Sequence, residues 1–102
     1  MSRILVVDDE LSMREFLEIF FIQEGHEVAV ASDGTEGVQL LHDNEYDLVI
    51  TDLKLPDQDG LAVLEAVKAR STDTEVVIVT AYGSIESAVE AIRQGAHDYL
   101  AK

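Results

Sequence analysis

The chain has 102 residues, 47% of them hydrophobic, and no cysteine, which fits one domain with a single core and excludes disulfides and thiolate metal sites. With 7 basic and 21 acidic residues the formal charge is −14, so we expect no direct contact of this domain with nucleic acid or an anionic membrane. The apolar runs are too short to cross a membrane, and the first residues do not form a signal peptide, so we expect a cytoplasmic protein.

Short apolar runs alternate with helical patterns from one end of the chain to the other. Strands are predicted at 4–7, 28–31, 48–51, 76–79 and 99–101. Helices are predicted at 12–25, 33–44, 61–69 and 84–95. This alternation is typical of a parallel sheet with helices on both faces. A fifth helix, which would cover the last strand, is missing from the chain.

Two of the helices carry specific expectations. Ser12 and Glu15 form an S-x-x-E pattern, which predicts a capping box at the start of the first helix. Its inward residues are expected to be Met13, Phe16, Leu17 and Phe20. The helix that starts at Ser84 has a weaker apolar face, namely Ile85, Ala88, Val89 and Ile92. Because it would bury less apolar area, we expect this helix to shift most easily.

Polar side chains follow three of the predicted strands where each strand ends: Asp8 and Asp9, then Asp52, then Thr80. The carboxyl ends of parallel strands meet at one edge of a sheet, so these side chains are expected to converge. Crowded carboxylates need a cation, and oxygen-only ligands favour Mg²⁺. With Lys102 at the end of the last strand, the formal charges of three Asp, one Mg²⁺ and one Lys balance. One carboxylate could then attack phosphorus as a nucleophile.

Each of these residues also has a simpler interpretation. The acids could form only a solvated surface, with Asp8 and Asp9 favoured beside a helix N-terminus. A haloacid-dehalogenase-type phosphatase would need a second Asp two residues after Asp52, where this chain has Lys54. A flavin-binding electron carrier would need Ser, Thr and Gly after the first strand, where acids would repel a phosphate.

A set of short motifs occurs in a fixed order along the chain: Val7-Asp8-Asp9-Glu10, then Asp52 with Leu55-Pro56 and Asp59-Gly60, then Thr80-Ala81, then Tyr99 three before Lys102. Together they resemble the receiver domain of two-component response regulators over the whole chain. The resemblance implies one receiver domain over residues 1–102, ending after the fifth strand. It also implies a flavodoxin-like (CheY-like), doubly wound parallel sheet of order 2-1-3-4-5.

The same resemblance implies a role for each site residue. Asp52 resembles the aspartate that takes a phosphoryl group from a sensor histidine kinase. The Mg²⁺ ligands would be Asp8, Asp9, Asp52 and the backbone carbonyl of Lys54. Thr80 and Tyr99 resemble the switch pair, and Lys102 resembles the phosphate-binding lysine. Such a protein is a regulatory phosphoacceptor rather than an enzyme, apart from its own phosphotransfer and slow autodephosphorylation.

The segment 80–91, with Gly95-Ala96 and Asp98-Tyr99-Leu100, is similar to receivers of nitrogen-regulation-type (NtrC-like) transcriptional activators. This implies ATPase and DNA-binding output domains in the full-length protein, and a homodimer as a further partner. The alternative that stays open is a receiver-like binding module that is never phosphorylated.

Overall fold

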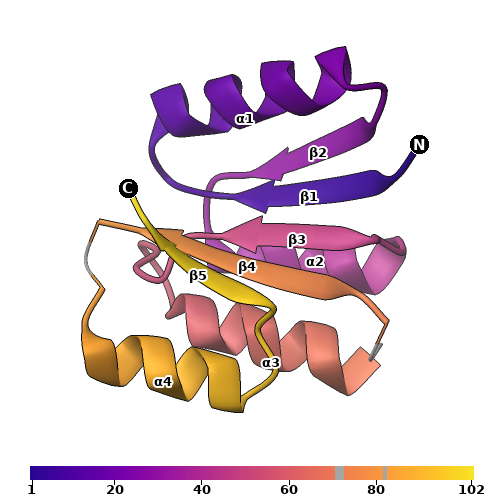
Figure 1. The fold of residues 1–102 in the computed structure, drawn as a ribbon. Helices are drawn as coiled ribbons and strands as arrows, with labels where there is room; N and C mark the ends of the chain where they lie inside the picture. Colours follow the sequence, from indigo (N-terminus) through magenta and orange to yellow (C-terminus); the bar gives the residue numbers. More distant parts are fainter. Residues whose placement is uncertain (71–72, 82) are drawn as a thin grey trace.

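The computed structural model describes residues 1–70, 73–81 and 83–102, and within them five parallel strands form one sheet (Figure 1). The strands are β1 (Arg3–Val7), β2 (Glu27–Ala31), β3 (Leu48–Thr51), β4 (Glu75–Thr80) and β5 (Asp98–Ala101). Between them lie α1 (Leu11–Gln23), α2 (Gly34–Asp43), α3 (Gly60–Arg70) and α4 (Ile85–Arg93). The order β2-β1-β3-β4-β5 confirms the predicted flavodoxin-like topology.

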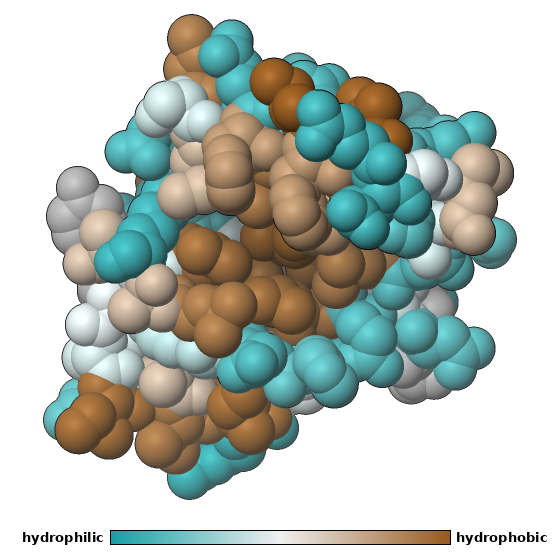
Figure 2. Space-filling model, turned by 45° about the horizontal axis from the view of Figure 1, so that its top comes forward, coloured by the Kyte–Doolittle hydropathy of each residue, from teal (hydrophilic) through white to brown (hydrophobic). Residues whose placement is uncertain are grey.

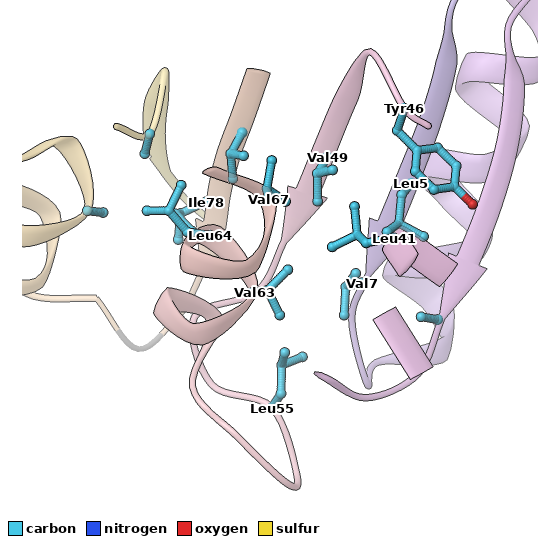
Figure 3. Close-up of a cluster of buried hydrophobic side chains, with 14 residues drawn as sticks. Leu5, Val7, Leu41, Tyr46, Val49, Leu55, Val63, Leu64, Val67 and Ile78 are labelled. Carbon is cyan, nitrogen blue, oxygen red and sulfur yellow. The ribbon is translucent and has the colours of Figure 1, made fainter. Parts of the chain in front are cut away.

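The two faces of the sheet are covered unequally. Helices α2, α3 and α4 lie on one face, and α1 lies alone on the other (Figure 1). The main core fills the first face, where β-branched and leucine side chains of the strands meet α2 and α3 (Figure 3). Members of this core that are completely inaccessible include Leu5, Val7, Val49, Val63, Leu64, Val76 and Ile78. Because strands of a parallel sheet carry apolar side chains on both faces, the second face needs cover as well.

The predicted capping box at Ser12 is wrong. Helix α1 begins at Leu11 with Glu10 as its N-cap residue, and no side chain caps it. The N–H of Glu10 donates instead to Oδ1 of Asp8, at 2.9 Å. This bond turns the chain directly after β1, so the helix starts before Ser12 and leaves that residue in its first turn.

The predicted inward faces of two helices are also partly wrong. In α1, Leu17 and Phe21 pack on the sheet, whereas Phe16 is 62% exposed and Phe20 46%. In α4 the buried residue is Ala91, and the larger side chains of Ile85, Val89 and Ile92 are exposed. In α1 apolar residues surround much of the helix, so periodicity did not determine which side would face the sheet. In α4 the large apolar residues do share one face, but that face is turned toward solvent.

A wide apolar surface is therefore open beside α1. Val77 and Val79 of β4 are only partly buried there, and Leu100 of β5 is 47% exposed. Figure 2 shows hydrophobic residues gathered in a hollow of the molecular surface. Patches of this kind are association sites in soluble proteins.

We expect these 102 residues to self-associate in solution because of that surface. Light scattering should give an average mass above that of one chain, and Leu100→Gln should lower it because an exposed apolar side chain of that surface is lost. The matched control is Phe21→Gln, which should destabilise the fold instead, since Phe21 packs on the sheet. A parent chain that stays strictly monomeric at high concentration would contradict the expectation.

No helix in the described parts of the chain is both long enough and apolar enough to span a membrane.

Candidate functional site

The carboxyl ends of β1 and β3 place Asp8 and Asp52 side by side. The two strands pair in parallel, with Val7 opposite Thr51. The pairing continues past both strands, because the N–H of Asp52 donates to the carbonyl of Val7 at 2.9 Å, and that of Asp8 to the carbonyl of Ala31 at 3.0 Å. Both aspartates are only 2% exposed. The predicted convergence of acids at this edge of the sheet is confirmed by their positions.

Lys102 reaches the same place from β5. Its N–H donates to the carbonyl of Thr80 at 3.0 Å, which extends the pairing of β4 with β5 by one residue. Its Nζ lies 2.9 Å from Oδ2 of Asp8 and 2.9 Å from Oδ2 of Asp52. The side chain is 13% exposed, and Oε1 of Glu10 lies 3.8 Å from Nζ at the rim. One ammonium therefore joins both buried carboxylates.

The pKa values of these groups reflect burial acting against charge pairing. Burial lowers the pKa of Lys102, but its hydrogen bonds to Asp52 and Asp8 outweigh this and hold the pKa above its usual value. Burial raises the pKa of the Asp8 carboxyl, and this effect exceeds the opposing effects of the Glu10 N–H and the Lys102 ammonium. The single lysine thus offsets only part of the cost of burying acids here.

The acid cluster fits a divalent cation. Oxygen atoms of Asp8, Asp9 and Asp52 all lie within 4.8 Å of one another, and Asp9 is exposed to solvent. With all three ionised, Lys102 leaves an excess of two negative charges. Only carboxylate oxygens contribute to this cluster, and such hard ligands suit Mg²⁺, which keeps several waters and uses few carboxylates.

A cavity of about 620 Å³ opens over this cluster. It is lined by Asp9, Glu10, Asp52, Lys54, Leu55, Pro56, Ala81 and Lys102. The N–H of Lys54 donates to Oδ1 of Asp52 at 3.2 Å, so the loop after β3 bends back around the carboxylate. The backbone of Lys54 thereby borders the space in which a ligand of Asp52 would sit.

The two predicted switch residues lie in different surroundings. Thr80 is 1% exposed at the end of β4, beside the backbone of Lys102. Tyr99 is partly buried, and its hydroxyl lies 2.9 Å from Oγ of Ser87 in α4. The tyrosine hydroxyl therefore contacts the first turn of α4 in this conformation.

Ser87 is a residue that sequence reasoning missed. Ser84 caps α4 by accepting from the N–H of Ser87 at 3.1 Å, and Oγ of Ser87 accepts from the N–H of Ser84 at 2.9 Å. The same Oγ contacts Tyr99, so one capping box holds both the helix end and the tyrosine. A side chain at Gly83 would overlap the Tyr99 ring, which explains the glycine there. The Ser-x-x-Ser spacing was the available signal.

Comparisons with known proteins agree with this fold and site. A profile described as "Response regulator receiver domain" matches residues 4–102. Among curated relatives, the regulatory protein AtoC of Escherichia coli is 40% identical over 101 residues, which cover 99% of this chain and 22% of AtoC. The chain belongs to the receiver-domain family of two-component response regulators. The curated relatives it matches, AtoC among them, are regulators of the nitrogen-regulation-type (NtrC-like) family.

Solved structures give the same result. A CheY-like receiver domain protein from Methanospirillum hungatei superposes with a TM-score of 0.94 at 34% identity, covering 100% of this chain and 82% of that one. The response regulator TrrA from Thermotoga maritima, solved in complex with Mg²⁺ and BeF, has a TM-score of 0.87 at 35% identity, with 100% and 87% covered. Receiver domains are phosphorylatable modules of regulatory proteins that bind Mg²⁺ at acidic residues.

Proposed function

We propose that Asp52 accepts a phosphoryl group from the phosphohistidine of a sensor histidine kinase. The Mg²⁺ for this transfer would be held by Asp8, Asp9, Asp52 and the backbone carbonyl of Lys54. The observation that carries the proposal is the buried Asp52 carboxylate, which shares the Lys102 ammonium with Asp8 at 2.9 Å on each side. A buried carboxylate paired with an ammonium, beside an excess of negative charge that a divalent cation would neutralise, is suited to phosphoryl transfer.

In the transfer, a carboxylate oxygen of Asp52 forms a bond to phosphorus while the bond from phosphorus to the histidine nitrogen breaks. The electrons of the broken bond stay on the histidine nitrogen, and one proton, carried by the phosphohistidine ring or taken from solvent, makes the leaving imidazole neutral. The products are an acyl phosphate on Asp52 and a neutral imidazole on the kinase. Bound Mg²⁺ would supply charge neutralisation for the phosphoryl oxygens. Lys102 lies within reach of the new phosphoryl oxygens, and Thr80 would donate its hydroxyl to them.

The proposed switch would act through the contacts around α4. Movement of Thr80 toward the phosphoryl group would leave space for Tyr99 to turn inward. That turn breaks the bond between the Tyr99 hydroxyl and Ser87, which belongs to the capping box of α4. Phosphorylation would thus favour an arrangement with a displaced α4, whose Ile85 is already 85% exposed.

The remaining parts of the proposal concern the protein beyond this domain. The chain spans 22% of the length of AtoC, so output is assigned to further domains, an ATPase and a DNA-binding domain, that the domain controls. In this proposal the kinase phosphorylates the domain in the cytoplasm. Output would be regulated through a homodimer. The domain acts as a regulatory phosphoacceptor, catalysing only its own phosphorylation and slow dephosphorylation.

Titration with beryllofluoride tests this proposal without covalent chemistry. With Mg²⁺ present, the amide NMR signals of residues 52–54 and of the first turn of α4 should shift and saturate. A phosphoryl-like group on Asp52 would change the loop beside it directly, and α4 through the proposed switch. Mg²⁺ alone should shift only the first set. No response to beryllofluoride in a chain that binds Mg²⁺ would instead favour a receiver-like module that is never phosphorylated.

A further inference from the structure

The tip of the loop that follows β3 is anchored on a different element, the first turn of α2. Oδ1 of Asp57 accepts from the N–H of Gly34 at 2.8 Å, and Oδ2 accepts from the N–H of Thr35 at 2.9 Å. The hydroxyl of Thr35 also donates to Oδ2. These bonds cross 22 to 23 residues of sequence. They satisfy backbone donors that a helix start otherwise leaves without partners.

This anchor is separate from the ordinary cap of the helix. Asp33 is the N-cap residue of α2 and accepts from the N–H of Glu36 at 2.8 Å. The contact of the loop with the helix is close, since a side chain at Gly34 would overlap Gln58. Two aspartates thus serve one helix start, and Asp57 is the one that joins it to the loop by hydrogen bonds.

The same loop carries the proposed metal ligand near its base. The backbones of Lys54 and Asp59 pair across the loop as an antiparallel bridge. The N–H of Gly60 donates to the carbonyl of Leu53 at 2.6 Å, which closes the base. Leu55 holds the inner side in the core, where it is 8% exposed. The loop is therefore a short arm with Lys54 near its base and Asp57 near its tip.

Asp57 is suited to act as a permanent acceptor. The Thr35 hydroxyl, followed by the N–H groups of Gly34 and Thr35, lowers the pKa of the Asp57 carboxyl to about 2. The group stays ionised at any pH at which the protein would work. A carboxylate at the N-terminus of a helix is also favoured by the helix dipole.

We propose that Asp57 is a positioning residue for Mg²⁺ binding: by fixing the tip of the loop to α2, it holds the Lys54 carbonyl in place as a ligand. The inference rests on the proposed function, in which that carbonyl binds the metal. Residues that do not touch a metal ion but hold its ligands in the right orientation strongly affect the affinity of the site for the metal. Because coupling between binding and conformation is reciprocal, Mg²⁺ binding should in turn steady the first turn of α2.

Replacing Asp57 by Ala should weaken Mg²⁺ binding about tenfold. This is the lower end of the range of affinity losses seen when a residue that orients a metal ligand is removed. The dissociation constant is measured by following backbone amide signals during titration with Mg²⁺. In the metal-free protein, hydrogen exchange at the Gly34 and Thr35 amides should become faster in the same variant. At saturating Mg²⁺, labelling of Asp52 by acetyl phosphate should return to the parent rate, because the reacting groups are intact.

Three matched variants separate positioning from other causes. Asp57→Asn keeps an acceptor for the helix and should bind Mg²⁺ with an affinity between those of the parent and Asp57→Ala. Asp33→Ala loosens the same helix start but leaves the loop anchored, and should bind like the parent. Glu65→Gln removes one exposed negative charge from α3 and should also bind like the parent.

Each contrary outcome has a distinct meaning. Parent-like Mg²⁺ affinity in Asp57→Ala would overturn the inference and leave the proposed function intact. Equal weakening by Asp33→Ala would overturn it as well, since loosening of α2 would then suffice. Equal weakening by Asp57→Asn and Asp57→Ala would attribute the effect to charge rather than to the anchor. A parent chain that binds no Mg²⁺ would overturn the proposed function and this inference together.

Discussion

Replacement of Asp52 by Asn is expected to abolish phosphoryl acceptance from acetyl phosphate and Mg²⁺. An amide oxygen is a far weaker nucleophile than a carboxylate, and we expect the neighbouring acids Asp8 and Asp9 to remain metal ligands rather than replace it. We expect incorporation of label to fall by more than about a thousandfold, within the range seen when a nucleophile is removed from an active site. The measurement is the rate of incorporation of labelled phosphate.

The variant should remain folded, which keeps the result interpretable. Asn has the size of Asp, and its one amide oxygen can still accept from the Lys102 ammonium at the position of Oδ2. Its NH2 group then replaces the oxygen that accepts from the N–H of Lys54, so that single bond to the loop is lost. The control is Asp59→Asn, which removes the same charge from an exposed position of the same loop. Labelling of Asp52→Asn at the parent rate, with Asp59→Asn also unchanged, would show that another residue accepts the phosphoryl group.

Replacement of Lys102 by Met is expected to lower the free energy of unfolding in the absence of divalent cations. The substitution leaves the buried carboxylates of Asp8 and Asp52 without their shared counter-ion. Breaking a buried pair from one side costs about 3 kcal/mol or more. The measurement is the urea midpoint in a chelating buffer.

Added Mg²⁺ should restore most of that stability, because a cation that binds only the folded state stabilises it by mass action. The variant should also bind Mg²⁺ more tightly than the parent, since a competing positive charge is gone. Arg93→Met is the matched control: the Arg93 side chain is 74% exposed and its surface ion pair contributes little. An unchanged urea midpoint for Lys102→Met would show that the lysine does not compensate the buried acids.

The sheet and the position of the acids were predictable from the sequence for one physical reason. Strands buried on both faces, such as β3, leave continuous apolar runs, and the residue after each run lies at the same edge of the sheet. Asp8, Asp52 and Thr80 follow directly from that rule. The first residue of α1 was not predictable in this way, because it depends on the direction in which the Asp8 carboxylate points.

The contacts that complete the site join residues far apart in the chain. Lys102 pairs with Asp52 across 50 residues. The sequence predicted that its charge would balance the acids at this edge of the sheet, but not that its ammonium would bond directly to both Asp8 and Asp52. The anchor of Asp57 on α2 and the bond of Tyr99 to Ser87 are likewise tertiary contacts. Local patterns such as periodicity and capping signals carry no information about them, so they required the structure.

Peptide mapping by mass spectrometry, after treatment of this chain with acetyl phosphate and Mg²⁺, tests the central claim most directly. We expect one phosphoryl group, located on the peptide that contains Asp52 and absent when Mg²⁺ is chelated. A phosphoryl group on a peptide without Asp52, or none at all in a folded chain that binds Mg²⁺, would contradict the account.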